Sequence, residues 1–223
     1  MKTVYCLCGL GADERIFGKL TWEPGIDVHY INWIIPNQDE TLADYAKRMA
    51  SKIICPGDFT LVGVSFGGIM AIEIAKLIPV KKLILISSIE THHQLPAWMK
   101  LCGRLKLYNL IPTGVLHDIR PLKLFEPIEN YFLGAYEDDQ KALANEYRKN
   151  VDPHYLKWSI KQILNWKNEV APENIYHLHG TGDRIFPIKK VKPTHSIKAG
   201  QHFMLYHKPG EVSAILNSIL KTA

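Results

Sequence analysis

Short apolar runs, rich in β-branched residues, alternate along the chain with amphipathic stretches. A run that is apolar at every position is typical of a strand buried on both faces of a parallel sheet. Runs of this kind predict six strands, at Thr3–Cys8, Asp27–Ile31, Phe59–Val62, Lys81–Ser88, Asn174–His179 and His195–Ala199.

Helical patterns lie between most of these runs. Thr41 is an N-cap residue, followed by an apolar stripe from Leu42 to Ile53, and a second helix follows residue 66 until Pro79 stops it. A last amphipathic helix contains Val212 to Leu220. The regular β and α alternation predicts a doubly wound, mostly parallel α/β sheet with right-handed crossovers.

The alternation stops between residues 91 and 172, where no convincing strand pattern occurs. Asp152-Pro153 is a cap followed by proline at the first helical position, and another helix runs from Glu137 to Lys149 with charges that match its dipole. This stretch is also rich in Trp and Tyr. We therefore expect a core made of residues 1–90 and 173–223, with residues 91–172 as a helical insertion.

Composition narrows the class of protein. The 223 residues are 47% hydrophobic and 22% charged, which suits one globular domain with an insertion. The net charge of +5 comes from scattered lysines without interleaved aromatic residues, so we expect no nucleic-acid partner. The four cysteines lack zinc-site spacing, so we expect no metal, and free thiols indicate a reducing compartment. No apolar run is long enough for a membrane span. These features predict a cytoplasmic protein.

One motif carries candidate chemistry. Gly63-Val-Ser65-Phe-Gly67 follows a strand and begins a helix, so the serine lies at the apex of a sharp turn with its hydroxyl clear of the backbone. Glycines on both sides allow the strand and the helix to approach closely. Any strand-to-helix loop can contain glycines and a serine, so the motif alone leaves a purely structural turn open.

In this context the chain resembles the α/β-hydrolase superfamily, whose nucleophile elbow has this form. The resemblance implies Ser65 as nucleophile and an oxyanion hole formed by the backbone amides of Leu10 and Phe66. Leu10 follows Gly9 in the loop after the first strand, and Cys8 stands where the family usually has histidine. The family also places a helical cap where residues 91–172 are inserted.

The resemblance implies the other two triad members. Asp183 ends a His-Gly-x-x-Asp run that is followed by a proline, and His202 lies in a Gly-x-His loop before the last helix. Glu90, just past the preceding strand, is the alternative acid, and His195 and His207 are the competing histidines.

His177 and His179 lie within a strand and are interpreted as structural. Ser65, Asp183 and His202 follow the chain order of this fold.

The combined interpretation is a serine hydrolase that cleaves a small carboxylic ester or related acyl compound without a cofactor. Two alternatives stay open: the same triad used for carbon–carbon bond hydrolysis or a lyase reaction, and a non-catalytic protein that binds a small ligand beneath the cap. Because many chemistries share one fold, the sequence does not identify the substrate. The aromatic-rich insertion also has an alternative role as a homodimer surface.

Overall fold

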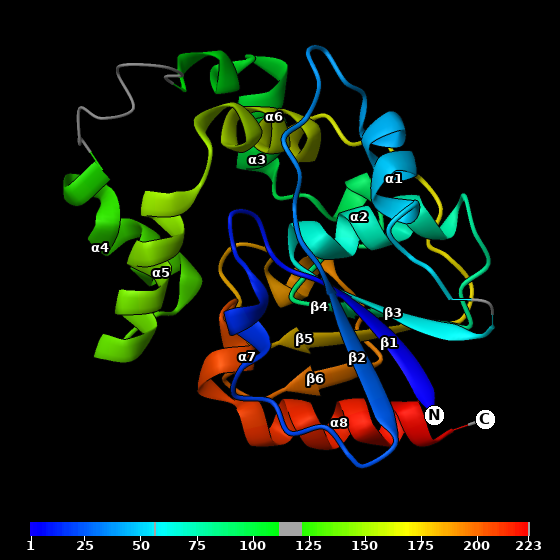
Figure 1. Cartoon of the computed structure of the whole chain (residues 1–223). Coiled ribbons are helices and arrows are strands. Elements are labelled where there is room, and N and C mark those ends of the chain that lie inside the picture. Colours follow the sequence, from blue (N-terminus) through cyan, green and yellow to red (C-terminus); the bar gives the residue numbers. More distant parts are fainter. Residues whose placement is uncertain (56, 112–121, 223) are drawn as a thin grey trace.

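A computed structural model of the chain describes residues 1–55, 57–111 and 122–222 and has a central β-sheet with helices on both faces (Figure 1). The strands are β1 (Lys2–Leu7), β2 (Ile26–Ile31), β3 (Phe59–Val64), β4 (Lys82–Ile86), β5 (Ile175–Gly180) and β6 (His195–Ile197). They form one six-stranded sheet of order β2-β1-β3-β4-β5-β6, in which every pairing is parallel. The predicted sheet is confirmed.

The helices lie on the two faces of the sheet and beyond the carboxyl ends of its strands. They are α1 (Leu42–Ala50), α2 (Phe66–Ala75), α3 (Ala97–Arg104), α4 (Leu122–Leu133), α5 (Asp138–Asn150), α6 (Pro153–Leu164), α7 (Met204–His207) and α8 (Pro209–Lys221). Short 3-10 helices are η1 (Glu14–Phe17), η2 (His92–Gln94), η3 (Leu107–Leu110) and η5 (Ile188–Lys190). None of the described helices is long and apolar enough to cross a membrane.

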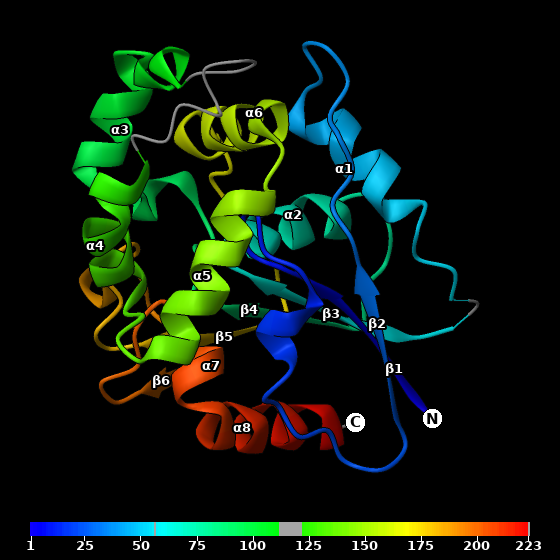
Figure 2. The ribbon, with the colours of Figure 1, turned by 60° about the vertical axis from the view of Figure 1, so that its left-hand side comes forward.

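The strands are buried on both faces, as their continuous apolar runs predict. In β1, Tyr5 and Leu7 pack against the α1 and α2 side, whereas Val4 and Cys6 face the side of α8. Figures 1 and 2 show α1 and α2 on one face of the sheet and α8 on the other. Two apolar cores therefore enclose the sheet, and the middle strands have no side exposed to water.

The predicted α1 begins as expected, because the Thr41 side chain accepts a hydrogen bond from the Asp44 amide. The second helix is shorter than predicted. Its pattern extends toward Pro79, but α2 ends at Ala75, and the amides of Leu77 and Ile78 both donate to the Ile74 carbonyl in a tighter last turn.

The segment between β4 and β5 contains α3 to α6 and, among its described residues, no strand. Residues 112–121 of the predicted insertion lie outside the described residues. As predicted, α6 starts at Pro153 after the Asp152 cap, and α5 starts after Glu137. Trp158 and Trp166 pack into the core shared with α1 and α2, so this part of the segment is continuous with the body of the protein.

Contacts on two sides hold the hairpin formed by α4 and α5 in place. Arg15 in η1 pairs with Glu146, and Lys19 approaches Asp139 to 2.6 Å, on the side of the loop after β1. On the other side, the Phe203 amide donates to the Leu133 carbonyl at 2.9 Å. Figure 1 shows α4 and α5 beyond the carboxyl ends of β5 and β6. The hairpin thus spans the loops at the carboxyl edge of the sheet.

Candidate active site

The reversal of strand order in the sheet places two loops side by side. After β1 the chain adds β2 on one side and β3 on the other, so the reversal lies between the carboxyl ends of β1 and β3. The loop at Gly9 leaves β1 there, and Ser65 directly follows β3. A Cβ added at Gly9 would lie 3.7 Å from the Ser65 Cβ. Open α/β sheets bind ligands at such a switch point.

Ser65 has the strained backbone of a nucleophile elbow, with φ 54° and ψ −117°. This conformation lies outside the common regions for a residue with a side chain, and its surroundings hold it in place. The Ser65 amide donates to the Ile86 carbonyl at 2.9 Å, and the Ser88 hydroxyl donates to the Ser65 carbonyl at 2.7 Å. Ser88 was not found from the sequence, because this contact joins neighbouring strands.

The structure brings Ser65, His202 and Asp183 into one hydrogen-bonded line. The Ser65 Oγ lies 2.9 Å from His202 Nε2, and His202 Nδ1 lies 2.8 Å from Asp183 Oδ2. A carboxylate only accepts, so His202 carries its proton on Nδ1 and its Nε2 is free to accept from the serine hydroxyl. This arrangement can deprotonate Ser65.

Asp183 is buried yet fully hydrogen-bonded. Its Oδ1 accepts from the amides of Ile185 and Phe186, both at 2.9 Å. Burial by itself raises the pKa of Asp183, but attraction to His202 and these hydrogen bonds outweigh it, and the pKa falls below its ordinary value. Asp183 is therefore an anion, placed where it can stabilise a positive charge on His202.

The loops of the acid and the histidine meet through backbone contacts. The Gly182 amide donates to the Gly200 carbonyl at 2.8 Å, and a Cβ at Gly180 would overlap the Gly200 backbone. Glycine at both positions therefore lets the two loops approach until His202 reaches Asp183.

Phe66 directly follows Ser65, and Leu10 follows Gly9, whose added Cβ would lie 3.7 Å from the Ser65 Cβ. Among the described residues neither the Leu10 amide nor the Phe66 amide has a hydrogen-bond acceptor. Phe66 is the first residue of α2, so its amide is one of the unpaired donors at a helix N-terminus. The loop of Leu10 is fixed by the Trp33 indole, which donates to the Gly9 carbonyl at 3.0 Å and stacks on the Phe66 ring. Trp33 was not identified from the sequence.

Cys8 is buried at the base of this loop. Burial, followed by the charges of Asp13 and Glu14, raises the pKa of its thiol, which stays neutral. Its side chain packs into the core on the α8 side of the sheet.

The competing residues lie elsewhere. Glu90 contacts His177, with 2.7 Å between Oε1 and Nδ1, and not His202. The His195 ring contacts the Thr194 hydroxyl, and the His207 ring at the end of α7 approaches the carbonyl of Phe203, the residue before α7. No group of three or more metal-ligating side chains is found among the described residues.

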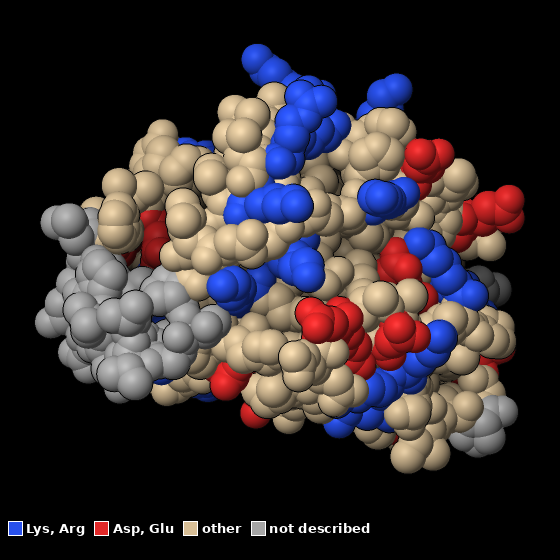
Figure 3. Space-filling model, turned by 90° about the horizontal axis from the view of Figure 1, so that it is seen from above, with Lys and Arg blue, Asp and Glu red and all other residues tan. Residues whose placement is uncertain are grey.

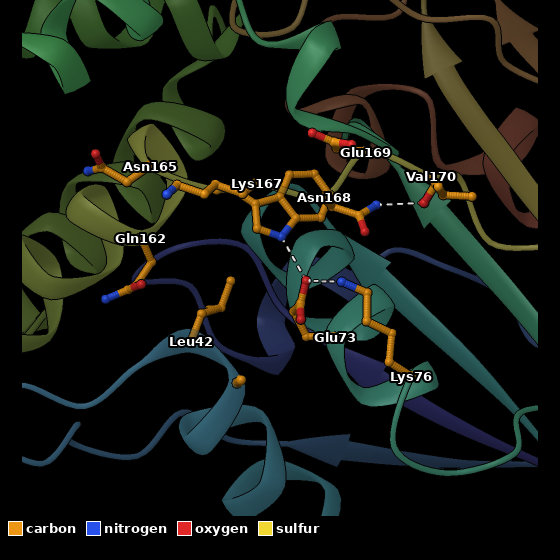
Figure 4. Close-up of a pocket in the computed structure, with 11 residues that line it drawn as sticks. Leu42, Glu73, Lys76, Gln162, Asn165, Lys167, Asn168, Glu169 and Val170 are labelled. Carbon is orange, nitrogen blue, oxygen red and sulfur yellow. Dashed lines mark hydrogen bonds and ion pairs between the residues drawn. The ribbon is translucent and has the colours of Figure 1, made fainter.

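A separate pocket of about 550 Å³ lies between α1, the second half of α2 and the chain after α6 (Figure 4). The Trp166 indole donates to Glu73 there at 2.8 Å, and Lys76 pairs with the same carboxylate. Neither the triad nor the loops around it line this pocket, so it is distinct from the candidate site.

Surface charge around the upper face is mixed. In the space-filling view, Lys and Arg side chains form several groups, with Asp and Glu side chains between them (Figure 3). Among the described residues of that face, no single-sign stripe of the kind that binds nucleic acid is seen.

The comparison of structures, and not that of sequences, relates this chain to known proteins. No protein-family model matches the sequence, and no curated protein matches it. The structure is similar to a hydrolase from Oleispira antarctica, with a TM-score of 0.73, 14% identity, and coverage of 100% of this chain and 92% of that chain.

It is also similar to a thermophilic esterase from Thermogutta terrifontis, with a TM-score of 0.70, 14% identity and coverage of 99% and 90% of the two chains. For an epoxide hydrolase from Bacillus megaterium the TM-score is 0.68, with 14% identity and coverage of 100% and 94%.

Proposed function

We propose that this chain, which has the α/β-hydrolase fold, is a serine hydrolase that cleaves a small carboxylic ester or related acyl compound. The observation that carries the proposal is the line from Ser65 Oγ to His202 Nε2 at 2.9 Å and from His202 Nδ1 to Asp183 Oδ2 at 2.8 Å. The similarity to an esterase and to other hydrolases supports hydrolysis as the reaction. Fold alone does not determine the chemistry, so the triad carries the argument.

The reaction begins with attack of Ser65 on the substrate carbonyl. His202 Nε2 accepts the hydroxyl proton as the Oγ–carbon bond forms, and Asp183 holds the ring and stabilises the imidazolium. The carbonyl oxygen becomes an anion, which accepts hydrogen bonds from the amides of Leu10 and Phe66. We place the oxyanion hole at these two amides, because Phe66 directly follows Ser65, Leu10 directly follows Gly9 at the switch point, and neither amide has an acceptor among the described residues.

Collapse of this intermediate breaks the bond to the leaving alcohol, which takes the proton from His202. An acyl ester on Ser65 remains. Water then attacks the ester carbonyl and gives its proton to His202, and the second collapse releases the carboxylic acid and restores the Ser65 hydroxyl. All groups used are side chains and amides of this chain, and the proposal includes no cofactor or metal.

We further propose that residues 91–172 form a cap over this site. The contacts of α5 with the η1 loop and of the Leu133 carbonyl with the Phe203 amide support the assignment, because both loops border the triad. Exposed apolar side chains on α3 and α4, including Trp98, Leu101 and Ile128, favour the second candidate role of these helices as a homodimer surface. Light scattering during size-exclusion chromatography distinguishes a dimer from a monomer.

A cytoplasmic location is part of the proposal. All four cysteines are free, and Cys6 and Cys8 are buried in the core, which suits a reducing compartment.

The direct test is labelling with a fluorophosphonate, which reacts with an activated serine. The expected result is one adduct on Ser65, located by peptide mass spectrometry, with no labelling of Ser65→Ala or of heat-unfolded protein. Absence of labelling in the folded wild type contradicts the proposed activity and favours the non-catalytic ligand-binding alternative. Labelling without hydrolysis of any ester would favour carbon–carbon hydrolysis or lyase chemistry.

A further inference from the structure

Behind the triad lies a second line of titratable side chains that the proposed mechanism does not use. The Glu90 Oε1 lies 2.7 Å from His177 Nδ1, and His177 Nε2 lies 3.1 Å from His179 Nδ1. Both histidines are on β5, two residues apart, so they share one face of the strand, and both side chains are fully buried. Glu90 follows β4, and its side chain is 13% exposed.

This line ends on the turn that holds the triad acid. The His179 Nε2 lies 2.7 Å from the Phe186 carbonyl oxygen and 3.6 Å from Asp183 Oδ2. The same Phe186 residue donates its amide to Asp183 Oδ1 at 2.9 Å. His179 therefore fixes the residue whose amide orients the carboxylate of Asp183.

The hydrogen-bond partners determine where the protons are. A carbonyl only accepts, so His179 carries hydrogen on Nε2. Burial lowers the pKa of His179 to about 4, which leaves the ring neutral with an accepting Nδ1. His177 must then donate from Nε2.

The remaining contact, between His177 Nδ1 and Glu90, also needs one hydrogen. It is supplied either by an imidazolium or by a protonated carboxyl. A buried pair of this kind is satisfied at every ring nitrogen, which burial requires.

We propose that Glu90, His177 and His179 are positioning residues that fix the orientation of Asp183, with Glu90 orienting the His177 ring and the His177 ring orienting that of His179. The proposal rests on the proposed hydrolase function. It assigns Glu90 a role three contacts away from Asp183, different from that of the triad acid. Loss of Glu90 leaves His177 Nδ1 without its partner, so the His177 ring, the His179 ring and the Phe186 turn can shift.

The kinetic test compares Glu90→Ala with Glu90→Gln in p-nitrophenyl ester hydrolysis. We expect Glu90→Ala to lower kcat about 10²-fold with KM unchanged, as a displacement of catalytic groups by about 1 Å does. Glu90→Gln should lose less than about tenfold, because its amide can still contact His177 Nδ1. Glu173→Ala, a change of an exposed glutamate just before β5, is the matched control and should keep the wild-type rate.

Two kinetic outcomes would overturn the proposal. A wild-type rate in Glu90→Ala means that the line does not support the site. A loss on the order of 10⁴, equal to that expected for Asp183→Asn, means that Glu90 acts as the triad acid itself.

The second measurement needs no activity. In protein labelled with ¹⁵N in its histidine rings, His177 should carry hydrogen on Nε2, and Glu90→Gln should leave that signal in place. A bare Nε2 overturns the assignment, even if Glu90→Ala fails to fold. Because the spectrum is independent of turnover, a protein with no esterase activity but the expected His177 signal contradicts the proposed function and not the hydrogen-bonded line.

Discussion

Ser65 occupies a backbone conformation that a residue with a side chain adopts at a cost of about 1–3 kcal/mol. The surrounding bonds from Ser88 and to Ile86 offset this cost, and the strain keeps the hydroxyl next to His202. The strain therefore comes from the backbone conformation of the turn and does not depend on the serine hydroxyl. Removing the hydroxyl alone should leave the turn intact.

The first prediction follows for Ser65→Ala. The variant should keep the wild-type circular dichroism spectrum and melting temperature, because alanine fits the same turn. Turnover should fall about 10⁶-fold, as loss of the nucleophile does in serine proteases. Ester hydrolysis by carefully purified variant, measured beside the wild type, provides the check. A rate close to wild type would contradict the assignment of Ser65 as the nucleophile.

The second prediction concerns pH and stability at His179. Its folded pKa of about 4, caused by burial, lies below the ordinary value of about 6.5. Between these values the unfolded chain binds a proton that the folded protein does not, so stability falls as pH decreases from about 6.5 to 4. The loss is on the order of 3 kcal/mol.

Urea unfolding at pH 7 and pH 4.5 measures this effect. His179→Gln can still donate from its Nε2 to the Phe186 carbonyl but does not titrate, so its stability should fall less than that of the wild type over the same interval. Equal losses in the two proteins would show that His179 does not carry the pH dependence.

The sequence predicts residues whose role depends on local position better than residues whose role depends on long-range contact. Ser65, Asp183 and His202 each follow a strand, and parallel strands bring their carboxyl ends to one edge. The interpretation of His177 and His179 as structural left out their line to Glu90, which joins residues 87 positions apart. Ser88 and Trp33 were missed for the same reason.

At the scale of elements, strand positions follow from apolar runs, because strands buried on both faces tolerate few polar residues. Each predicted strand overlaps the observed one. Helix ends are less well determined by apolar pattern, as the early end of α2 shows. There Leu77 leaves the helix in a tighter turn and is half exposed, whereas Ile78 contacts the core.

The third prediction tests the crossing of β1 and α2. A Cβ added at Gly67 would overlap the carbonyl oxygens of Leu7 and Cys8, which are backbone atoms that cannot move without displacing β1. Gly67→Ala should therefore destabilise the fold and reduce serine labelling, because the same movement displaces Leu10. The measurements are the urea midpoint and the rate of fluorophosphonate labelling.

Gly210→Ala is the matched control for this change. Gly210 lies in α8 with no atom within 4 Å of an added Cβ, so alanine should stabilise the protein by up to about 1 kcal/mol through helix propensity. If Gly67→Ala and Gly210→Ala had the same stability, close packing would not explain why position 67 is a glycine.

At the scale of the whole molecule, the α4–α5 hairpin is attached to the loop that carries Asp183 and to the loop that carries His202. Arg184 follows Asp183 directly, and its guanidinium lies 4.2 Å from the Tyr131 ring centroid and donates to the Tyr131 carbonyl at 3.0 Å. It also donates to Gln201, the residue before His202, at 2.8 Å. Arg184 thus joins the hairpin to the acid loop and the histidine loop, and we infer that the hairpin limits the space in front of Ser65.

The last prediction is the size of the acyl group that this space accepts. Each buried methylene contributes about 0.8 kcal/mol, so rates should rise with acyl length while the pocket fills. They should fall once the chain meets the hairpin, because overpacking costs about 1–3 kcal/mol. p-Nitrophenyl esters of increasing acyl length, with Ser65→Ala as the blank, should therefore give a sharp optimum at short or medium chains. In Arg184→Ala, which loses the contacts to Tyr131 and Gln201, the optimum should move to longer chains. Undiminished activity on long-chain or emulsified esters in the wild type would contradict a limiting cap, since a chain of that length can be accommodated only if the hairpin leaves Ser65 open.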